Sequence, residues 1–179
     1  GVRRLPTYHE RISKGWIRPG AEFEIIKESP ALALVDGHIG VGSVVAQKGM
    51  ELAIEKAKIS GIGTVVVRNS THFGSSAVPA RLALEQDCIG IAITNAGPEM
   101  APWGGREGRV GTNPWVLVAP TGGDFPIVLD FAITTAGKGM MRWYEREGKK
   151  MPLDWALTPD GHETDDPTSA MAGALLGIG

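Results

Sequence analysis

Apolar runs and helix-like periodicities alternate along the first half of the chain. Four runs have the length and composition of β-strands, and they span residues 23–27, 31–35, 64–67 and 89–94. Two segments between them have apolar residues at helical spacing: residues 43–60, which Gly61 ends, and residues 75–86. This alternation of strands and helices predicts an α/β layer with right-handed crossovers.

The two strand-like runs at residues 64–67 and 89–94 are apolar without a regular polar alternation. Uninterrupted apolar strands are typical of strands that are covered on both faces. We therefore expect both runs to be buried strands of the same layer.

The second half of the chain has a different pattern. A glycine-rich loop at residues 98–111 precedes two short strands, and a helix is expected from residue 134 or 135 to 148. Asp166 and Pro167 have the composition of a helix start. No segment has the composition of a linker between independent domains, so residues 1–179 are predicted to form one α/β region.

Polar residues follow the two buried strands at the point where each strand ends. Asn69, Ser70, Thr71 and His72 follow the first, and Asn95 follows the second. If the strands are parallel, both polar ends lie at one edge of the sheet, where α/β proteins bind ligands. His72 is the strongest catalytic candidate there, because histidine exchanges protons near neutral pH. The alternative is a structural histidine that bonds a turn carbonyl.

Composition limits the classes of function. The formal net charge is −2 and no basic run is present, so neither nucleic acid nor a membrane surface is an expected partner. No apolar run approaches the roughly 18 residues of a membrane span. The single cysteine, Cys88, excludes an internal disulfide and suits a reducing compartment, so a cytoplasmic location is expected. The spacing of histidines, cysteine and acids resembles no metal site.

Three further motifs leave alternatives open. Gly40 and Gly42 precede a helix as in a dinucleotide fingerprint, but Val45 takes the third glycine position and a tight corner is the favoured interpretation. Asp130 closes an apolar strand, where it could bond a sugar hydroxyl or cap the next helix. Arg106 and Arg109, in the glycine-rich loop, could hold an anion or be ordinary surface arginines.

Taken together, several segments of the chain resemble one family. They are GVRRLPTYHERI at 1–12, ALVDG at 33–37, MELAIEKA at 50–57, VRNSTHFG at 67–74, IGIAITN at 89–95, APWGGREGRVGTNP at 101–114, VLDFA at 128–132 and DWAL at 154–157. The combination is similar to the malate/L-lactate dehydrogenase family, which also contains ureidoglycolate, sulfolactate and diketogulonate dehydrogenases and cyclic-imine reductases.

The resemblance implies an oxidoreductase that uses NAD or NADP on small 2-hydroxy acids, 2-keto acids or related imines. It implies an unusual, non-Rossmann α/β fold, with a mixed and mainly parallel sheet flanked by helices, and a homodimer. By the same resemblance, His72 is the acid–base residue and Arg4 holds the substrate carboxylate. The cofactor-binding positions it implies are Asn95, Ala96, Thr112, Asn113, Asp130, Phe131 and Ala132, with Ala96 at a position that is often serine.

Members of the family extend further on both sides. A second histidine in a Ser-His-Gly motif and a lysine-bearing glycine motif are expected outside residues 1–179, so we expect this region to be an incomplete family domain. Two alternatives to the dehydrogenase reading remain: a truncated, non-catalytic homologue that serves binding or assembly, and a cyclic-imine reductase of the same family. An ordinary Rossmann reductase that uses Gly40 and Gly42 is a further rival.

Overall fold

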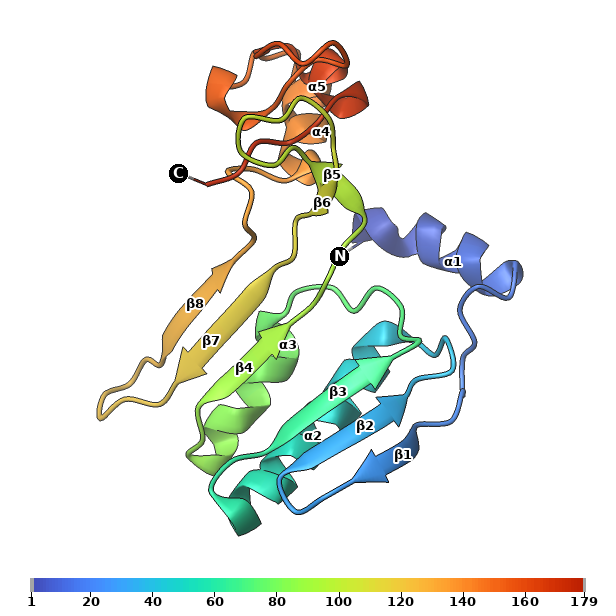
Figure 1. Cartoon of the computed structure of the whole chain (residues 1–179), viewed down its shortest axis with the longest axis vertical. Helices are drawn as coiled ribbons and strands as arrows, with labels where there is room; N and C mark the ends of the chain where they lie inside the picture. The colour runs from blue at the N-terminus through green and yellow to red at the C-terminus, as the bar shows by residue number, and fades with distance from the viewer. Residues whose placement is uncertain (1, 179) are drawn as a thin grey trace. The chain divides into compact units, whose positions relative to one another are not determined.

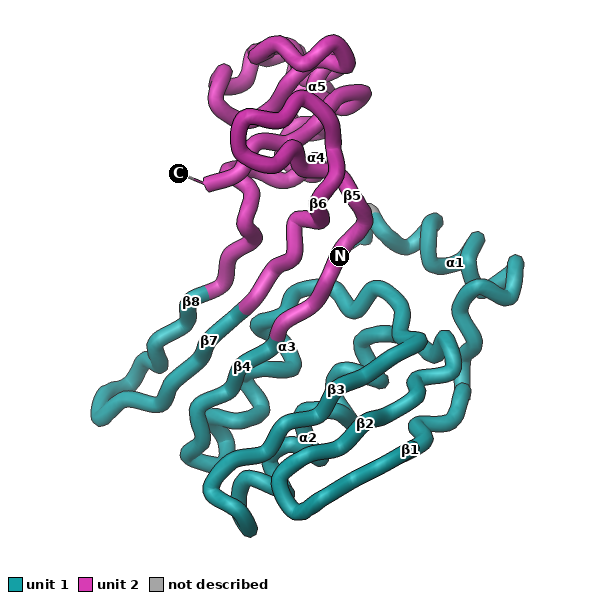
Figure 2. The backbone as a smooth tube through the Cα atoms, in the orientation of Figure 1, with its two compact units in different colours: residues 1–92, 116–129 teal, residues 93–115, 130–179 magenta. Residues whose placement is uncertain are grey.

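The computed structural model describes residues 2–178 and has a mixed α/β fold, which confirms the predicted class (Figure 1). Two compact units make up the chain (Figure 2). Unit 1 contains the residues up to 92 together with 116–129, and unit 2 contains residues 93–115 and 130–179. The backbone passes between the units at several points, so no single linker joins them.

Unit 1 begins with a short 3-10 turn, η1 (Val2–Arg4), and helix α1 (Leu5–Ser13). The first sheet follows, in the order β1–β2–β3. Its strands are β1 (Glu24–Glu28), β2 (Leu32–Asp36) and β3 (Thr64–Arg68). β1 pairs with β2 in the antiparallel sense, and β2 pairs with β3 in the parallel sense.

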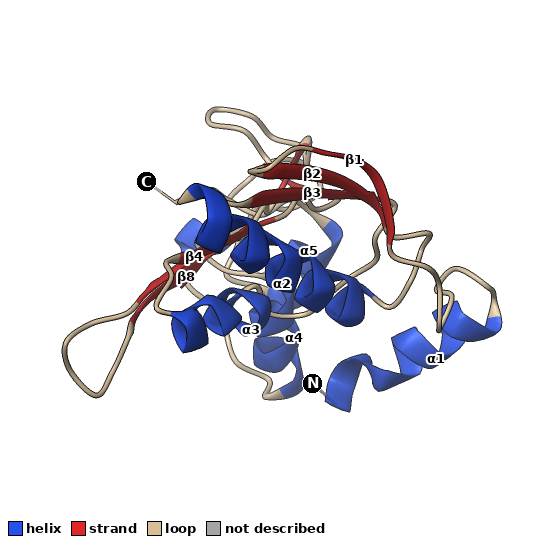
Figure 3. Cartoon of the chain, turned by 90° about the horizontal axis from the view of Figure 1, so that it is seen from below, coloured by secondary structure: helices blue, strands red, loops and turns tan. Residues whose placement is uncertain are grey.

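Helix α2 (Gly42–Ser60) connects β2 to β3 and packs against both, so these elements form a βαβ unit. Figure 3 shows α2 on one side of this sheet. Gly49 lies at the contact, because a Cβ there would touch the side chains of Val65 and Val67 at ordinary distances. The predicted stop is confirmed: Gly61 has φ of 78°, a left-handed conformation that glycine adopts without steric cost.

The second sheet has the order β4–β7–β8. Its strands are β4 (Gly90–Ile93), β7 (Trp115–Ala119) and β8 (Ile127–Phe131). Only four residues of the helix predicted at 75–86 are α-helical, in α3 (Ala77–Ala80), and the rest is the 3-10 segment η2 (Arg81–Gln86). Ala80 packs with Val116 and Val118 in a small buried cluster.

The expectation that the two buried strands share one sheet is wrong. β3 pairs with β2, whereas β4 pairs with β7 in a separate sheet. Burial on both faces is also wrong for the chain as described: helices cover one face, while Val66 and Ile91 remain 57% and 53% exposed on the other. An apolar run identifies a strand, but its sequence does not specify the neighbour with which it pairs.

Unit 2 is a small mixed region around a methionine-rich core. It contains β5 (Pro98–Met100), β6 (Val110–Gly111), α4 (Lys138–Arg146), η3 (Leu153–Trp155) and α5 (Pro167–Ala172). β5 and β6 are antiparallel. The core cluster contains Met100, Met141, Met151 and the fully buried Leu175. The predicted start of α5 is confirmed, since the Asp166 carboxylate accepts a hydrogen bond from the backbone N–H of Ser169.

Candidate active site

His72 lies just beyond β3, in the segment 69–72 that we call the His72 loop. Tyr8, on α1, is its partner: the Tyr8 hydroxyl is 2.6 Å from His72 Nδ1, and the two rings are tilted with centroids 5.8 Å apart. The bond fixes the orientation of the imidazole and engages Nδ1. Nε2 is therefore the ring nitrogen that can exchange a proton with a substrate.

Two arginines and the surrounding protein act on the charge state of His72. Partial burial lowers the pKa of this histidine below its ordinary value, and the positive charges of Arg4 and Arg11 lower it further. Because its pKa is lowered, the ring is mainly neutral at pH 7. It is also exposed to solvent, so a small molecule can reach it. Neutral imidazole is the form that accepts a proton from an alcohol.

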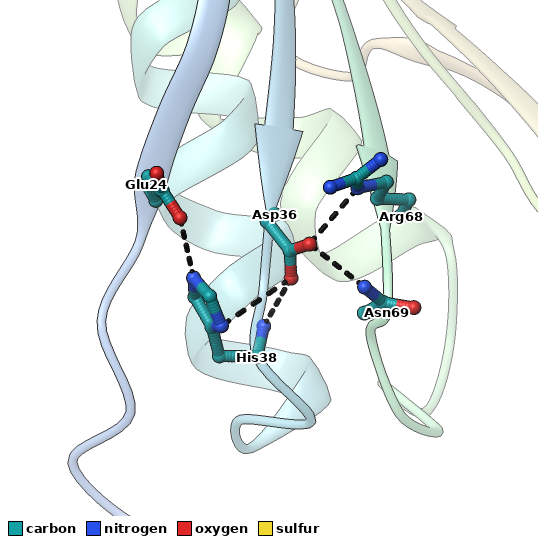
Figure 4. Close-up of polar contacts among 5 residues, drawn as sticks. All are labelled: Glu24, Asp36, His38, Arg68 and Asn69. Atoms are coloured by element: carbon teal, nitrogen blue, oxygen red, sulfur yellow. Dashed lines mark hydrogen bonds and ion pairs between the residues drawn. The ribbon is translucent and has the colours of Figure 1, made fainter.

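A buried carboxylate anchors the start of the His72 loop (Figure 4). Asp36, at the end of β2, is only 4% exposed. Its carboxylate accepts hydrogen bonds from the backbone N–H of His38 at 2.8 Å, from Arg68 Nε at 2.9 Å and from Asn69 Nδ2 at 2.7 Å. His38 Nε2 in turn contacts Glu24 at 2.7 Å. The contacts of His38 with Asp36 and Glu24 are those of a structural residue.

These hydrogen bonds set the charge of Asp36. The backbone N–H of His38 lowers the pKa of this carboxyl, and Asn69 and Arg68 act in the same direction, against the opposing effect of burial. Asp36 is therefore ionised in the folded protein. Removing its charge weakens its hydrogen bonds to these three donors, because bonds to an ionised acceptor are the stronger ones.

The segment 37–41, which we call the β2–α2 corner, also holds the His72 loop through its backbone. The N–H of Gly37 donates to the carbonyl of Arg68 at 3.0 Å, and the N–H of Ile39 donates to the carbonyl of Asn69 at 2.7 Å. Ile39 has φ of 53°, a conformation that is rare for a β-branched residue. Its bond to Asn69 helps to hold that strained conformation in place.

Close packing explains why position 42 is a glycine, without any role in dinucleotide binding. A Cβ at this position would lie 2.2 Å from the carbonyl oxygen of Thr71 and 2.6 Å from the backbone of His72. The glycine therefore lets the His72 loop approach the start of α2. This contact favours the tight-corner interpretation of Gly40 and Gly42 over the Rossmann fingerprint.

The residues expected to bind a cofactor gather in unit 2. The N–H of Ala96 donates to Asn113 Oδ1 at 3.0 Å, which joins two of the segments. The N–H of Ile133 donates to the carbonyl of Thr112 at 3.0 Å, which joins the third. These residues are far apart in the sequence, and only the family resemblance implied that they lie together. All seven belong to unit 2: Asn95, Ala96, Thr112, Asn113, Asp130, Phe131 and Ala132.

The chemistry of this region fits a dinucleotide. Asn95 and Asp130 are exposed and offer an amide and a carboxylate, groups that bond sugar hydroxyls. Asp130 lies within β8, and the N-cap residue of α4 is Gly137, so Asp130 does not occupy the N-cap position of that helix. The Phe131 ring is half-buried and its centroid is 5.0 Å from that of Trp115, which provides an aromatic surface.

Comparison with known proteins gives the family. The family model described as malate/L-lactate dehydrogenase matches residues 1–179. The chain is 43% identical to the L-sulfolactate dehydrogenase of Methanocaldococcus jannaschii over 179 residues, which is 100% of this chain and 52% of that protein. The chain belongs to the malate/L-lactate dehydrogenase family.

Other family members support the same assignment. The malate dehydrogenase of Pyrococcus horikoshii is 42% identical over 180 residues, which cover 100% of this chain and 50% of that protein. The crystal structure of malate dehydrogenase from Entamoeba histolytica matches with a TM-score of 0.96 at 39% identity, over 100% of this chain and 52% of that one. This family chain thus spans about half the length of the curated relatives it matches.

A reductase of cyclic imines has the same fold. The crystal structure of delta1-piperideine-2-carboxylate reductase from Pseudomonas syringae matches with a TM-score of 0.94 at 29% identity, over 100% of this chain and 54% of that one. The same fold therefore occurs in proteins named as malate dehydrogenase and as delta1-piperideine-2-carboxylate reductase. None of the helices that the structure describes is long and apolar enough to cross a membrane.

The remaining sequence candidates have plainer environments. Arg109 forms an ion pair with Glu107 on the exposed glycine-rich loop, which agrees with the interpretation of an ordinary surface arginine. Arg4 ends η1 and is only half-exposed, and its charge acts on His72. Tyr8 and Asp36 were missed, because nothing in the sequence relates either residue to a histidine tens of positions further along the chain.

Replacing Asp36 by asparagine tests the anchor of the His72 loop. Because the pKa of Asp36 is lowered in the folded state, its ionised form adds stability above the ordinary value of 3.8, and that stability is lost as the pH falls through the lower folded value. Asp36→Asn should therefore lower the free energy of unfolding at pH 7, with the deficit shrinking below about pH 4.

Urea unfolding from pH 7 to pH 3 measures this difference. Asp124→Asn, on an exposed turn, removes one carboxylate without breaking such a network and serves as the matched control. A deficit for Asp36→Asn that stays constant over the whole pH range would contradict the assignment of an ionised, hydrogen-bonded Asp36.

Proposed function

We propose that this chain is the part of an NAD- or NADP-dependent oxidoreductase that carries its acid–base histidine and much of its cofactor site. The reaction interconverts a small 2-hydroxy acid and its 2-keto acid. The observation that carries the proposal is the His72–Tyr8 pair: a neutral, partly solvated imidazole with Nδ1 engaged, beside the charges of Arg4 and Arg11. Family membership supports the class of reaction.

Each site residue has a role in this proposal. His72 takes the hydroxyl proton through Nε2 during oxidation and returns it during reduction. Arg4 holds the substrate carboxylate, since a guanidinium binds a carboxylate through two parallel hydrogen bonds. Asn95, Asp130 and Thr112 bond the cofactor, and Phe131 packs against it. The nicotinamide ring supplies the hydride chemistry when it is bound.

The substrate class follows from the same geometry and from the relatives. Malate and sulfolactate, which name two of the relatives, are both 2-hydroxy acids with a second acidic group. A cyclic-imine carboxylate is the second candidate, because it presents the same carboxylate to Arg4 and a C=N bond to the hydride donor. The reductase of similar fold from Pseudomonas syringae supports this alternative.

Assembly and location are part of the proposal. The family resemblance supports a homodimer, and the composition supports a cytoplasmic location without nucleic acid or a membrane as partner. The single cysteine and the formal charge of −2 agree with this setting. Size-exclusion chromatography with light scattering should give a mass of twice the chain's 18.9 kDa, and a mass of one chain at micromolar concentration contradicts the dimer.

His72→Asn tests the proposed catalytic role. Reduced nicotinamide is followed by absorbance with the 2-keto acids of malate, lactate and sulfolactate, and with a cyclic-imine carboxylate. General acid–base catalysis contributes about 10²–10⁴-fold, so kcat should fall by that factor while the Kd of the cofactor changes little.

His162→Asn is the matched control, because His162 is an exposed histidine in a turn. It should keep the wild-type rate. Unchanged turnover in His72→Asn rejects the acid–base role of this histidine. Absence of turnover in the wild-type protein with every substrate is expected both for a non-catalytic homologue and for an incomplete family domain, so the His72→Asn comparison then uses the chain together with the remaining family segments.

The pH dependence of oxidation follows from the lowered pKa of His72. The proton acceptor is the neutral ring, so kcat/KM for the hydroxy acid should fall only when the pH drops below that lowered value, at a midpoint under 6.5. Tyr8 is a titratable group in direct contact with the ring, and Arg4 and Arg11 act on it through their charge.

Arg11→Gln removes one of the charges that lowers the pKa, so its midpoint should move to higher pH. Arg81→Gln, an exposed arginine on η2, leaves those charges in place and is the control. A midpoint that stays fixed in Arg11→Gln shows that the titration does not belong to His72.

A further inference from the structure

We propose that Thr71 is the positioning residue of His72: its side-chain hydroxyl fastens the His72 loop to the first turn of α2. This inference rests on the proposed acid–base role of His72, and it concerns the residue that fixes where the backbone of that histidine lies. In the sequence, Thr71 is only one polar residue in the run that precedes His72.

The hydroxyl of Thr71 makes two hydrogen bonds to the same stretch of chain. It donates to the carbonyl of Gly40 at 2.7 Å and accepts from the backbone N–H of Gly42 at 3.0 Å. A hydroxyl has one hydrogen, and the bond to the Gly40 carbonyl uses it. The side chain is therefore committed to the β2–α2 corner and has no hydrogen left to donate to a substrate.

The bond to Gly42 replaces a helix cap. The N-cap residue of α2 is Val41, which has no side chain that can accept a hydrogen bond. The first N–H groups of a helix have no partner within the helix, and a Ser or Thr oxygen often satisfies one of them. Here that oxygen comes from Thr71, 29 residues further along the chain.

Close packing makes the position of His72 sensitive to this contact. The carbonyl of Thr71 and the backbone of His72 fill the space where a Gly42 side chain would be. Backbone hydrogen bonds already tie the end of β3, at Arg68, and the start of the loop, at Asn69, to the β2–α2 corner. Thr71 is the last tie before the histidine, so it decides where the backbone of His72 leaves the surface of α2.

The two ends of His72 are therefore held by different elements. Thr71 links its backbone to α2, a helix of 19 residues that packs against the first sheet. Tyr8, on α1, holds its ring through Nδ1. If the Thr71 tie is lost, the loop can shift relative to α1, the Tyr8 bond weakens and Nε2 loses its fixed direction. A misplacement of about 1 Å can cost up to about 10²-fold in rate.

Three substitutions test the role of the hydroxyl in the whole chain. Thr71→Val keeps the shape but places a methyl group against Gly40 and Gly42. Thr71→Ala removes the hydroxyl without that clash and serves as the second variant should the valine protein not fold. Thr71→Ser keeps the hydroxyl and is the conservative rescue.

The decisive measurement is an NMR titration of the His72 ring, which needs neither cofactor nor turnover. In Thr71→Val and Thr71→Ala, the pKa of His72 should rise toward its ordinary value of 6.5 as the ring leaves Tyr8 and gains solvent. Thr71→Ser should keep the wild-type titration. In an active enzyme kcat should fall roughly 10-fold, while the KM of the keto acid, bound by Arg4, changes less than about twofold.

A different result separates a helix cap from a positioning residue. If folded Thr71→Val and Thr71→Ala lose thermal stability but keep the wild-type His72 titration, Thr71 only caps α2 and the proposal is overturned. If the His72 titration shifts while the wild-type protein turns over no substrate, the positioning role stands and the dehydrogenase function is the part that fails.

Discussion

A single buried carboxylate governs the architecture around His72. The parallel register of β2 and β3 places Asp36 opposite Arg68, at the carboxyl ends of both strands. Because Asp36 is almost fully buried, its charge needs hydrogen-bond donors, and burying it without them would be costly. Those donors are His38 in the β2–α2 corner, Arg68 at the end of β3 and Asn69 at the start of the His72 loop. The β2–α2 corner and the His72 loop therefore cannot separate without exposing the charge or leaving it unpaired.

This constraint explains how a loop can hold the proposed acid–base residue in a defined geometry. Loops are more mobile than the elements they connect, and an acid–base residue has to keep its orientation through each reaction cycle. Here the loop is fastened by the Asp36 network at its start, by backbone hydrogen bonds at residues 68 and 69 and by the Thr71 hydroxyl before the histidine. The sheet and α2 supply the rigidity that the loop lacks.

Local patterns predicted local structure well, and long-range contacts poorly. The strand runs, the span of α2 and its stop at Gly61 could be read from periodicity and turn chemistry, and the structure confirms them. Strand pairing could not, because an apolar run is compatible with several neighbours, and β3 and β4 proved to lie in separate sheets. The place of His72 after a strand makes it a catalytic candidate from sequence alone, whereas its contact with Tyr8 could not be predicted, because the two residues are 64 positions apart.

The glycines before α2 show how one motif can have two physical causes. A glycine at a helix start can admit a pyrophosphate, or it can admit another segment of the same chain. At Gly42 the second cause is sufficient: the Thr71 carbonyl occupies the space of a side chain, and the Thr71 hydroxyl accepts the first N–H of the helix. A phosphate at this helix end would compete with that hydroxyl for the same donor. The absence of a complete glycine fingerprint and the presence of Thr71 are thus two aspects of one arrangement, in which the start of α2 serves to hold His72.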